Sequence, residues 1–285
     1  MEVSGAARRP RRTKVIRPPR FSLGGLLADL RNLADYRDLF ITLTIHRINV
    51  RYKQSMLGLA WAIVNPLSLM LVYTLVFSRV AKMPSEELPY AAFVYSALLP
   101  WTFFSASVVN AASGMISHAN LITKVYFPRE ILPLTYVFAA LFDLLAAFVV
   151  MAGLMGYYRI APTWQLLWAI PILAIAVVFA TSLSFLFSVT QARFRDVAIV
   201  MPLVLQLWLF ATPVVYPLSR VPSSLRPWYV LNPMTAVVES FRVVVLLGKP
   251  PDLELLAMSA AITGVLAPLT YLYFKQREAG MADVI

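Results

Sequence analysis

One acidic side chain, Asp143, lies inside the long apolar run AALFDLLAAF at residues 139–148. A carboxylate at such a position is costly within a bilayer, so it either takes part in function or is paired by a neighbouring helix. A single acid is too little for a proton relay, which disfavours a proton-coupled carrier. His46 and His118 are the only two histidines. We expect them to be interfacial polar residues rather than metal ligands or catalytic bases.

A compact charged segment, NLITKVYFPREILPL at residues 120–134, separates two other apolar runs. No sequence motif for soluble-type catalysis accompanies it: there is no G-x-x-x-x-G-K-[ST], no H-E-x-x-H and no G-x-S-x-G. The chain has no cysteine, which excludes a disulfide and a thiolate metal site. A membrane-embedded glycosyl- or acyltransferase would need clustered carboxylates or histidines near a membrane face. The sequence has no such cluster, and this class is kept as an alternative.

The composition identifies the apolar runs as membrane spans. Only 14% of the 285 residues are charged and the mean hydropathy is +0.72, whereas a soluble domain has about 25% charged residues. Several runs reach the ~20 residues needed to cross a bilayer. We therefore predict an all-α polytopic membrane protein with six transmembrane helices, at residues 57–78, 89–112, 131–158, 165–190, 197–215 and 253–274.

Positive charge is concentrated near the N-terminus. Residues 1–53 contain 12 Lys and Arg against 4 Asp and Glu, so 8 of the net charge of +11 lies there. By the positive-inside rule the N-terminus is cytoplasmic, and six spans also keep the basic C-terminal FKQRE inside. Residues 1–21 are predicted to be a disordered basic tail near anionic headgroups rather than a nucleic-acid-binding arm. Residues 22–56 predict an amphipathic interface helix, although an ordinary soluble cap would show the same pattern.

Residues 228–247, WYVLNPMTAVVESFRVVVLL, are apolar enough to suggest a seventh span. However, the Asn232-Pro233 pair breaks a helix, and Glu239 and Arg242 would each cost ~2.5–3.5 kcal/mol at a helix centre. A seventh span would also export the C-terminus. We therefore predict that 214–249 forms re-entrant or interfacial helices on the outer side. Irregular backbone at membrane depth must be covered by protein or line a cavity, so this segment points to a pathway.

Aromatic residues crowd the predicted spans. Interfacial belts are the usual reason for tryptophan and tyrosine near membrane boundaries, but flat apolar faces could also line a channel on which sugar rings stack. No strong charge accompanies them, which disfavours a small-ion channel with a charged filter. The candidates for channel lining are Tyr73, Phe77, Tyr95, Trp101, Phe103, Phe104, Trp208 and Phe210.

Six strings occur in a fixed order along the chain: RINVRYKQSMLGLAWAIVNPLSLMLVYTLVF (47–77), LLPWTFF (98–104), LITKVYFPREILPL (121–134), RFRDV (193–197), TPVVYP (212–217) and LNPM (231–234). Together they resemble the membrane subunit of ABC-2-type polysaccharide exporters, which move O-antigen, capsule or teichoic-acid chains across the bacterial inner membrane. The resemblance covers nearly everything after residue 36 and leaves out the Arg/Pro-rich tail. An ABC-2 exporter of a drug or of another lipid would share this architecture and is the first alternative.

The resemblance implies a six-span transmembrane domain over 57–285, in a homodimer whose channel forms between the protomers. This chain would bind no cofactor and no metal; two copies of a separate ABC ATPase subunit would bind ATP and Mg beneath it. The substrate would be a polysaccharide held on undecaprenyl diphosphate, and the other partners would be membrane lipids, with no nucleic acid. The resemblance places the protein in the bacterial inner membrane as a multi-pass protein with both termini in the cytoplasm.

The resemblance also implies roles for individual residues. The cytoplasmic segment 113–130 would carry a coupling helix that seats in the ATPase, formed by Lys124, Tyr126, Phe127, Pro128, Arg129 and Glu130. Proline suits a first helical turn, and aromatics with paired charges suit a protein interface. A second ATPase contact would come from Arg193, Arg195 and Asp196. The outer gate would be shaped by Pro213, Tyr216, Asn232 and Pro233, a set that the turn chemistry of a re-entrant hairpin also explains.

The string RINVRYKQS lies where the interface helix would meet the first span. It supplies Arg47, Arg51, Tyr52, Lys53 and Gln54. By the resemblance, these side chains could grip lipid headgroups, the substrate diphosphate or the ATPase. Arginine suits a diphosphate because its planar guanidinium donates two parallel hydrogen bonds. Plain positive-inside anchoring explains most of these cations without any substrate.

Overall fold

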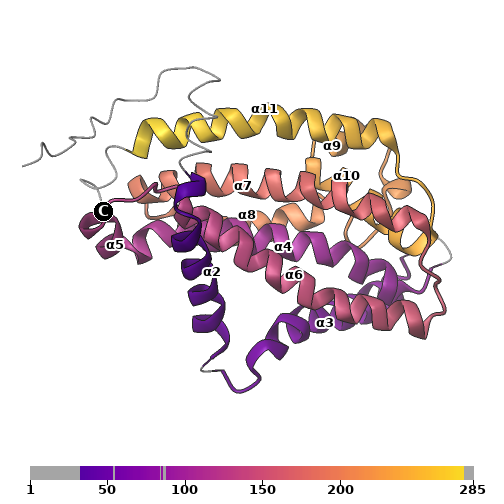
Figure 1. The fold of residues 1–285 in the computed structure, drawn as a ribbon. Helices are drawn as coiled ribbons and strands as arrows, with labels where there is room; N and C mark the ends of the chain where they lie inside the picture. Colours follow the sequence, from indigo (N-terminus) through magenta and orange to yellow (C-terminus); the bar gives the residue numbers. More distant parts are fainter. Residues whose placement is uncertain (1–32, 54, 84, 86–87, 279–285) are drawn as a thin grey trace, which may run out of the picture.

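The computed structural model describes residues 33–53, 55–83, 85 and 88–278. The regular elements within these residues are all helices, which confirms the prediction of an all-α chain. The predicted basic tail (1–21), the start of the predicted interface helix (22–32) and Gln54 lie outside the described residues. Figure 1 shows an elongated bundle in which the long helices run side by side.

Five helical stretches are long and apolar enough to cross a membrane, and each coincides with a predicted span. Two of these stretches consist of an α-helix extended by short 3-10 or π-helical segments. Gly58–Val80 contains α3 (Trp61–Tyr73), and Trp164–Arg193 contains α7 (Ala169–Arg193). The other three are α4 (Tyr90–Ser117), α6 (Ile131–Tyr157) and α11 (Leu253–Glu278). The prediction of these five apolar helices is confirmed.

The predicted fifth span, residues 197–215, contains a shorter helix. Helix α8 (Val197–Phe210) has 14 residues, which correspond to about 21 Å at the usual rise of an α-helix. The hydrocarbon core of a bilayer is about 30 Å thick. A sixth crossing through α8 therefore stays a prediction, because the length of the helix alone does not establish it.

Helix α4 forms the centre of the bundle. It packs against α3, α6, α7, α8 and α10, and its side chains Phe93, Tyr95 and Phe104 have no exposed surface. Nearly continuous apolar sequence over residues 90–101 suits this position, because a helical segment that is apolar all round is buried; the later half of α4 keeps some exposed surface on one side. Helix α4 is thus the central helix against which other helices of the bundle pack.

One end of the bundle collects the segments that were predicted to be cytoplasmic. Figure 1 shows α5 (Ala119–Lys124), the connection between α7 and α8, and the last turns of α11 at this end. Helix α2 (Arg37–Tyr52) crosses the same end at a steep angle to the long helices. The ring of Phe40 in α2 meets that of Phe138 in α6 edge to face, with centroids 5.0 Å apart. We call this the inner end.

The opposite, outer end holds short helices between α8 and α11. They are α9 (Arg226–Val230) and α10 (Pro233–Arg242), and α10 continues into a π-helical turn, Val243–Leu247. The side chain of Asn232 caps α10 by accepting a hydrogen bond from the Met234 amide at 3.1 Å. Gly248 closes the turn with a left-handed φ of 60°. Short helices predicted for 214–249 are therefore present, while their re-entry into a membrane stays a prediction.

The helix in the predicted coupling segment lies earlier in the chain than predicted. We predicted one helix through Lys124 and Glu130, but α5 ends at Lys124 and residues 125–128 are not helical. Pro128 lies instead in the turn that enters α6, where its carbonyl oxygen accepts a hydrogen bond from the Ile131 amide at 3.2 Å. A proline disfavours the α conformation in the residue before it, which explains why the helix cannot continue through Phe127.

Candidate functional site

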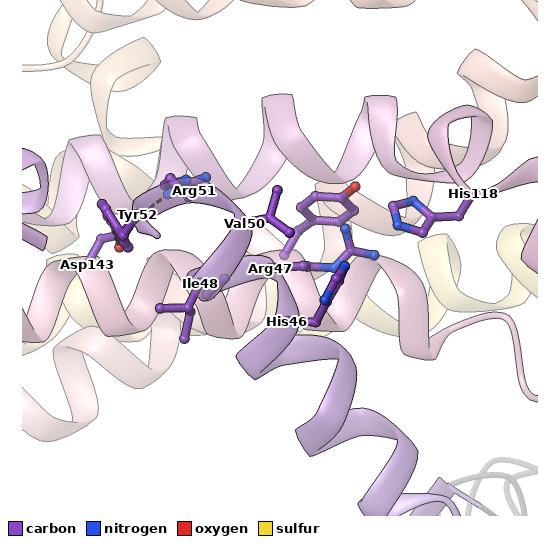
Figure 2. Close-up of a pocket in the computed structure, with 10 residues that line it drawn as sticks. His46, Arg47, Ile48, Val50, Arg51, Tyr52, His118 and Asp143 are labelled. Carbon is purple, nitrogen blue, oxygen red and sulfur yellow. Dashed lines mark hydrogen bonds and ion pairs between the residues drawn. The ribbon is translucent and has the colours of Figure 1, made fainter. Parts of the chain in front are cut away.

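A cavity of about 370 Å³ opens at the inner end, between the C-terminal half of α2 and the helices α4 and α6. Figure 2 shows basic and aromatic side chains converging on it from these helices. Its polar lining consists of His46, Arg47, Arg51, Tyr52, His118, Tyr136 and Asp143. We call this cavity the basic pocket.

The carboxylate of Asp143 is bound by the last turn of α2. Its Oδ2 forms an ion pair with the guanidinium of Arg51, and its Oδ1 accepts a hydrogen bond from the Tyr52 hydroxyl at 2.6 Å. The structure therefore joins two features that the sequence left separate, the acid in an apolar run and the basic string RINVRYKQS. Of the two readings of Asp143, pairing by a neighbouring helix describes its surroundings in this structure.

Arg47 lies one helical turn before Arg51, on the same face of α2. Its Nε donates a hydrogen bond to the Thr135 hydroxyl at 2.5 Å, and its guanidinium carbon lies 3.4 Å from the centre of the Tyr136 ring. Such stacking on an aromatic face attracts a cation. Its Nη2 is buried and has no hydrogen-bond partner among the described residues. The N–H groups of Nη2 therefore have no hydrogen-bond partner within the described chain in this conformation, although the atom itself is buried.

The ring of Tyr136 fits against α4 because residue 114 is a glycine. A Cβ atom at Gly114 would overlap the Tyr136 ring. The Gly114 carbonyl lies 3.0 Å from His118 Nδ1, and the His118 ring meets Tyr136 edge to face with centroids 6.4 Å apart. His118 and Tyr136 therefore form one wall of the basic pocket, and Gly114 allows the Tyr136 ring to pack against α4.

The electrostatics of the basic pocket favour an anion. Burial, reinforced by the nearby charge of Arg47, lowers the pKa of His118, which favours the neutral imidazole. Burial and the hydrogen bond to Asp143 raise the pKa of Tyr52 to about 12, so its hydroxyl remains a donor. Two guanidinium groups then face one carboxylate, and the pocket keeps an excess of positive charge.

Replacing Gly114 with Ala should disturb this wall. The added methyl group must displace the Tyr136 ring, and such overpacking costs about 1–3 kcal/mol of unfolding free energy. Gly153→Ala in α6 is the matched control, because no atom lies within 4 Å of a Cβ atom there. An exposed helical glycine is disfavoured by about 0.5–1 kcal/mol relative to alanine, so the control should be slightly stabilised. Chemical unfolding of the purified variants in detergent would measure both, and equal shifts would contradict the proposed packing.

In the predicted coupling segment, the side chain of Tyr126 is exposed and that of Phe127 is buried. Tyr126 is 65% exposed, whereas Phe127 is 4% exposed and packs into the cluster of Met115, Ile122, Phe185, Val189 and Phe274. Lys124 and Val125 are also exposed, while Pro128 and Arg129 are half-buried. The prediction that Phe127 contacts a partner is therefore wrong for this conformation, because its ring already fills the protein's own core.

Glu130 is likewise turned inward, which corrects its predicted partner contact. It is 2% exposed, and its Oε1 pairs with the Lys275 ammonium of α11 at 2.8 Å. Glu278 accepts hydrogen bonds from Lys275 at 3.0 Å and from the Arg129 amide at 3.1 Å, and its carbonyl oxygen accepts one from the Arg129 guanidinium. Burial and nearby Glu278 raise the pKa of Glu130, and Lys275 opposes this shift. These charges tie the coupling segment to the last helix.

The second predicted partner contact is exposed throughout. Arg193 is the last residue of α7, and Arg195 and Asp196 lie in the connection to α8; all three side chains are exposed. Phe194 between them is 59% exposed, and the Arg193 guanidinium carbon lies 5.8 Å from the centre of its ring. Figure 1 places this connection at the inner end, as it does α5. The inner end thus presents two separate exposed aromatic residues, Tyr126 and Phe194.

The predicted channel aromatics divide into two groups. Tyr95, Trp101, Phe103 and Phe104 are at most 3% exposed and pack in the core. A side chain without accessible surface cannot touch a passing molecule, so their packing role overrides the channel-lining prediction in this conformation. The remaining four, Tyr73, Phe77, Trp208 and Phe210, keep exposed surface, and their channel role stays a prediction.

The predicted outer-gate residues are joined by hydrogen bonds. The hydroxyl groups of Tyr216 and Tyr229 lie 2.7 Å apart, and Asn232 Nδ2 donates to the Thr212 hydroxyl at 2.9 Å. The carbonyl oxygen of Pro233 accepts from the Ser259 hydroxyl in α11 at 3.1 Å. These contacts connect the end of α8 with α9, α10 and α11. A gating role for them stays a prediction.

Arg242 organises this outer region, a role that the sequence did not predict. It is 1% exposed, and its Nη2 donates to the carbonyl oxygens of Pro213 and Val214 at 2.8 and 3.2 Å. Its Nη1 pairs with Glu239 at 2.7 Å, and its guanidinium carbon lies 3.8 Å from the centre of the Phe93 ring. The charges that argued against a seventh span therefore form one cluster, in which Arg242 is buried and Glu239 is half-buried.

The sequence model of the ABC-2 type transporter family matches residues 38–246. This range extends from α2 to the π-helical turn after α10. The chain belongs to the ABC-2 type transporter family. The match includes the α2 and α6 residues of the basic pocket and both exposed loops of the inner end. Among the described residues, this transporter subunit has no cluster of three metal-ligating side chains.

Several curated relatives cover most of this ABC-2 type transporter. The O-antigen export system permease protein RfbA of Myxococcus xanthus is 33% identical over 258 residues, 90% of this chain and 98% of the relative. RfbA of Klebsiella pneumoniae is 31% identical over 212 residues, 74% of this chain and 81% of the relative. The polysialic acid transport protein KpsM of Escherichia coli is 26% identical over 237 residues, 78% of this chain and 87% of the relative.

The sequence interpretation of this ABC-2 type transporter did not select Tyr136, Lys275 or Glu278, although two signals were present. Tyr136 precedes Asp143 by seven residues, which places both on one face of a helix. Lys275 and Glu278 are spaced for an i,i+3 pair at the end of α11. Their partner Glu130 lies far away in the sequence, and no local pattern indicates that contact.

Proposed function

We propose that this chain is the permease subunit of an ATP-driven exporter that moves a lipid-linked polysaccharide out across the bacterial inner membrane. The relatives named for O-antigen export and polysialic acid transport support a polysaccharide cargo. The chain has no G-x-x-x-x-G-K-[ST] loop for ATP, so the energy source is assigned to a partner ATPase. The observation that carries the proposal is the exposed pair of aromatics, Tyr126 and Phe194, at the inner end of this family member.

The two exposed loops are the proposed ATPase contacts. An aromatic ring that projects from a loop is the kind of side chain that anchors a protein interface. Lys124 and Tyr126 would form one contact, and Phe194 with Arg193 and Arg195 the other. The ion pairs of Glu130 and Arg129 with α11 would then pass a movement of the first contact to the last helix. Asp196 would complete the polar rim of the second contact.

A homodimer is supported by one face of α4. Although most of α4 is buried, a stripe of polar side chains along it keeps exposed surface: Thr102, Ser105, Asn110, Ser113 and Ser117. Polar side chains within a membrane normally face protein or water rather than lipid. A second protomer opposite this stripe would enclose a path with weak hydrogen-bonding groups. Tyr73, Phe77, Trp208 and Phe210 would contribute the apolar surface of that path.

The inner end is proposed to face the cytoplasm. The positive-inside rule supports this orientation, because the basic N-terminal block precedes α2 in the sequence and α2 lies at that end. Helix α2 would then lie in the inner interface, since it crosses the bundle at a steep angle. Helix α8 would make the sixth crossing with the residues that follow it, which returns the C-terminus to the cytoplasm. The short helices of 214–249 would shape the outer gate.

The basic pocket is the proposed site for the diphosphate of the lipid carrier. Its excess positive charge, the unpaired Nη2 of Arg47 and the exposed guanidinium of Arg51 all suit a phosphate oxygen. The pocket lies at the junction of α2 with the transmembrane bundle, which is where a headgroup in the inner leaflet would arrive. Lys53 is exposed beside it and would add long-range attraction.

Transport by the reconstituted complex tests this function. Proteoliposomes containing the full chain and its ATPase partner should move a lipid-linked polysaccharide to the side of the membrane opposite the ATPase only with ATP and Mg. A non-hydrolysable ATP analogue and liposomes without the ATPase are the controls. Movement of the polysaccharide in either control would overturn the ATP-driven assignment. Transport of small lipids or dyes without any movement of the polysaccharide would identify an exporter of another cargo.

A further inference from the structure

The two carboxylate ion pairs at the inner end differ in how far they are sealed. In the Glu130–Lys275 pair the side chains are 3% and 13% exposed, whereas in the Asp143–Arg51 pair they are 21% and 38% exposed. A buried ion pair stays together because separating its charges would leave each charge buried without a partner, which costs free energy. A half-exposed pair at the edge of a cavity can exchange partners with a competing anion. The Asp143–Arg51 pair meets that description.

The groups that bind Asp143 are those that would bind a phosphate. A guanidinium and a phenol hydroxyl converge on the two carboxylate oxygens. Arg47 lies in the same pocket with its buried Nη2 unpaired. A diphosphate carries more negative charge and more acceptor oxygens than a carboxylate, so it would gain more from both arginines.

We propose that Asp143 is an internal counter-anion, which a diphosphate group displaces from Arg51, and that this displacement releases the end of α2 from α6. The inference rests on the proposed function, since it describes how the cargo's headgroup enters the basic pocket. Asp143 thereby holds the pocket in a closed state until a stronger anion arrives. The same carboxylate also selects ligands by charge, because a weakly charged ligand cannot displace it from Arg51.

Both contacts of Asp143 break together in this exchange. Tyr52 belongs to the same last turn of α2 as Arg51, so its hydroxyl, which lies 2.6 Å from Oδ1, leaves the carboxylate with the guanidinium and becomes a donor to the phosphate. Arg51 lies in the last turn of α2, one residue before Tyr52, so a small rotation of this turn would separate the guanidinium from Oδ2. Lys53 follows outside the helix. The movement would therefore be confined to the junction between α2 and the first span.

A polyisoprenoid diphosphate and an anionic phospholipid could both supply the phosphate group. The cavity of about 370 Å³ falls in the range of about 300–1,000 Å³ that is usual for small-molecule sites. Farnesyl diphosphate is a soluble probe of the first source, and farnesol is its control without phosphate. Nanodiscs of phosphatidylcholine lack anionic lipid, whereas nanodiscs with phosphatidylglycerol contain it, so the two sources can be separated.

The decisive experiment measures binding of farnesyl diphosphate to the full chain in phosphatidylcholine nanodiscs. Asp143→Asn removes the competing charge and should bind the probe about tenfold more tightly than the wild type, a difference of about 1.4 kcal/mol. Arg51→Gln should bind it at least about tenfold more weakly. Equal or weaker binding by folded Asp143→Asn would overturn the proposal, because a purely structural carboxylate predicts that result. Binding of farnesol as tight as that of the diphosphate would also overturn it.

Phosphatidylglycerol then assigns the source of the displacing phosphate. If it weakens farnesyl diphosphate binding to the wild type but not to Arg51→Gln, bilayer lipid occupies the site and displaces Asp143. If it has no effect, the diphosphate of the cargo lipid is the displacing group. Both results support the displacement, provided that Asp143→Asn binds more tightly.

A second measurement follows the released helix and does not require an Asp143 variant. The chain has no cysteine, so a pair of introduced cysteines carries spin labels without background. Met56, which follows α2, and Leu145 in α6 are both exposed and do not line the basic pocket, so they suit Met56→Cys with Leu145→Cys. Farnesyl diphosphate should lengthen or broaden the distance distribution between the labels, and farnesol should leave it unchanged. An unchanged distribution at saturating diphosphate would overturn the release of α2.

The proposed function can fail separately from this inference. If proteoliposomes with the wild-type chain export no polysaccharide, the proposed function is wrong, whatever the binding data show. If they export it but Asp143→Asn does not bind farnesyl diphosphate more tightly, only the counter-anion role is wrong.

Discussion

Replacing Arg242 with Met should destabilise the protein by about 3–5 kcal/mol, because it removes a buried charge that pairs with Glu239 and donates to backbone carbonyl oxygens. Arg242 is 1% exposed and connects three segments: α10, the chain after α8, and α4. Its loss would leave Glu239 and the carbonyl oxygens of Pro213 and Val214 without this donor. Chemical unfolding in detergent micelles and the amount of protein inserted into membranes would both report the loss.

Arg226→Met is the matched control for this prediction. Arg226 is also at the outer end, but its side chain is exposed, and such a surface change usually stays within about 0.5 kcal/mol. Arg242→Lys should fall between the two, because lysine keeps the charge but lacks the planar fork that reaches several acceptors at once. If Arg242→Met and Arg226→Met unfold alike, the cluster around Arg242 does not hold the outer end together.

The long apolar helices could be predicted from the sequence because their signal is local. A run of ~20 apolar residues is sufficient evidence for a span, and five of the six predicted runs are helices of adequate length. Helix α8 shows the limit of this reasoning, since its apolar run continues beyond the helix end at Phe210. The composition of an apolar run does not show at which residue the helix within it ends.

The pairing of charges could not be predicted, because it depends on which helices are neighbours. Asp143 and Arg51 are 92 residues apart, and Glu130 and Lys275 lie on the first turn before α6 and near the end of α11. Each charge was visible in the sequence as an anomaly within apolar surroundings. A buried charge requires a partner, so the sequence indicates that a contact exists but not with which residue.

The orientation of aromatic side chains was the weakest part of the prediction. Tyr95, Trp101, Phe103 and Phe104 were candidates for a channel, yet α4 is enclosed by five neighbouring helices and buries them. Periodicity cannot identify the exposed face of a helix that is apolar all round. The polar residues Ser105 and Asn110 mark the exposed side of α4 better than its aromatics do.

Tyr126→Ala and Phe127→Ala should have opposite consequences although the two residues are adjacent. Phe127 fills the core cluster beside Ile122 and Phe274, so its truncation should cost about 3–5 kcal/mol of unfolding free energy. Tyr126 is 65% exposed, and its truncation should leave stability within about 0.5 kcal/mol. If Tyr126 anchors the ATPase, its loss should weaken ATPase binding by about 2 kcal/mol or more, roughly 30-fold.

Two measurements on each variant separate these effects: unfolding of the purified permease, and the ATP consumed per polysaccharide exported by proteoliposomes with the ATPase partner. Phe194→Ala, at the second exposed loop, should behave like Tyr126→Ala, because its ring is 59% exposed. Stable Tyr126→Ala and Phe194→Ala variants that still bind the ATPase and export normally would exclude both loops as coupling contacts. A Phe127→Ala variant that unfolds like the wild type would show that the segment is not anchored through this ring, and the division of the two aromatics between core and partner would then be wrong.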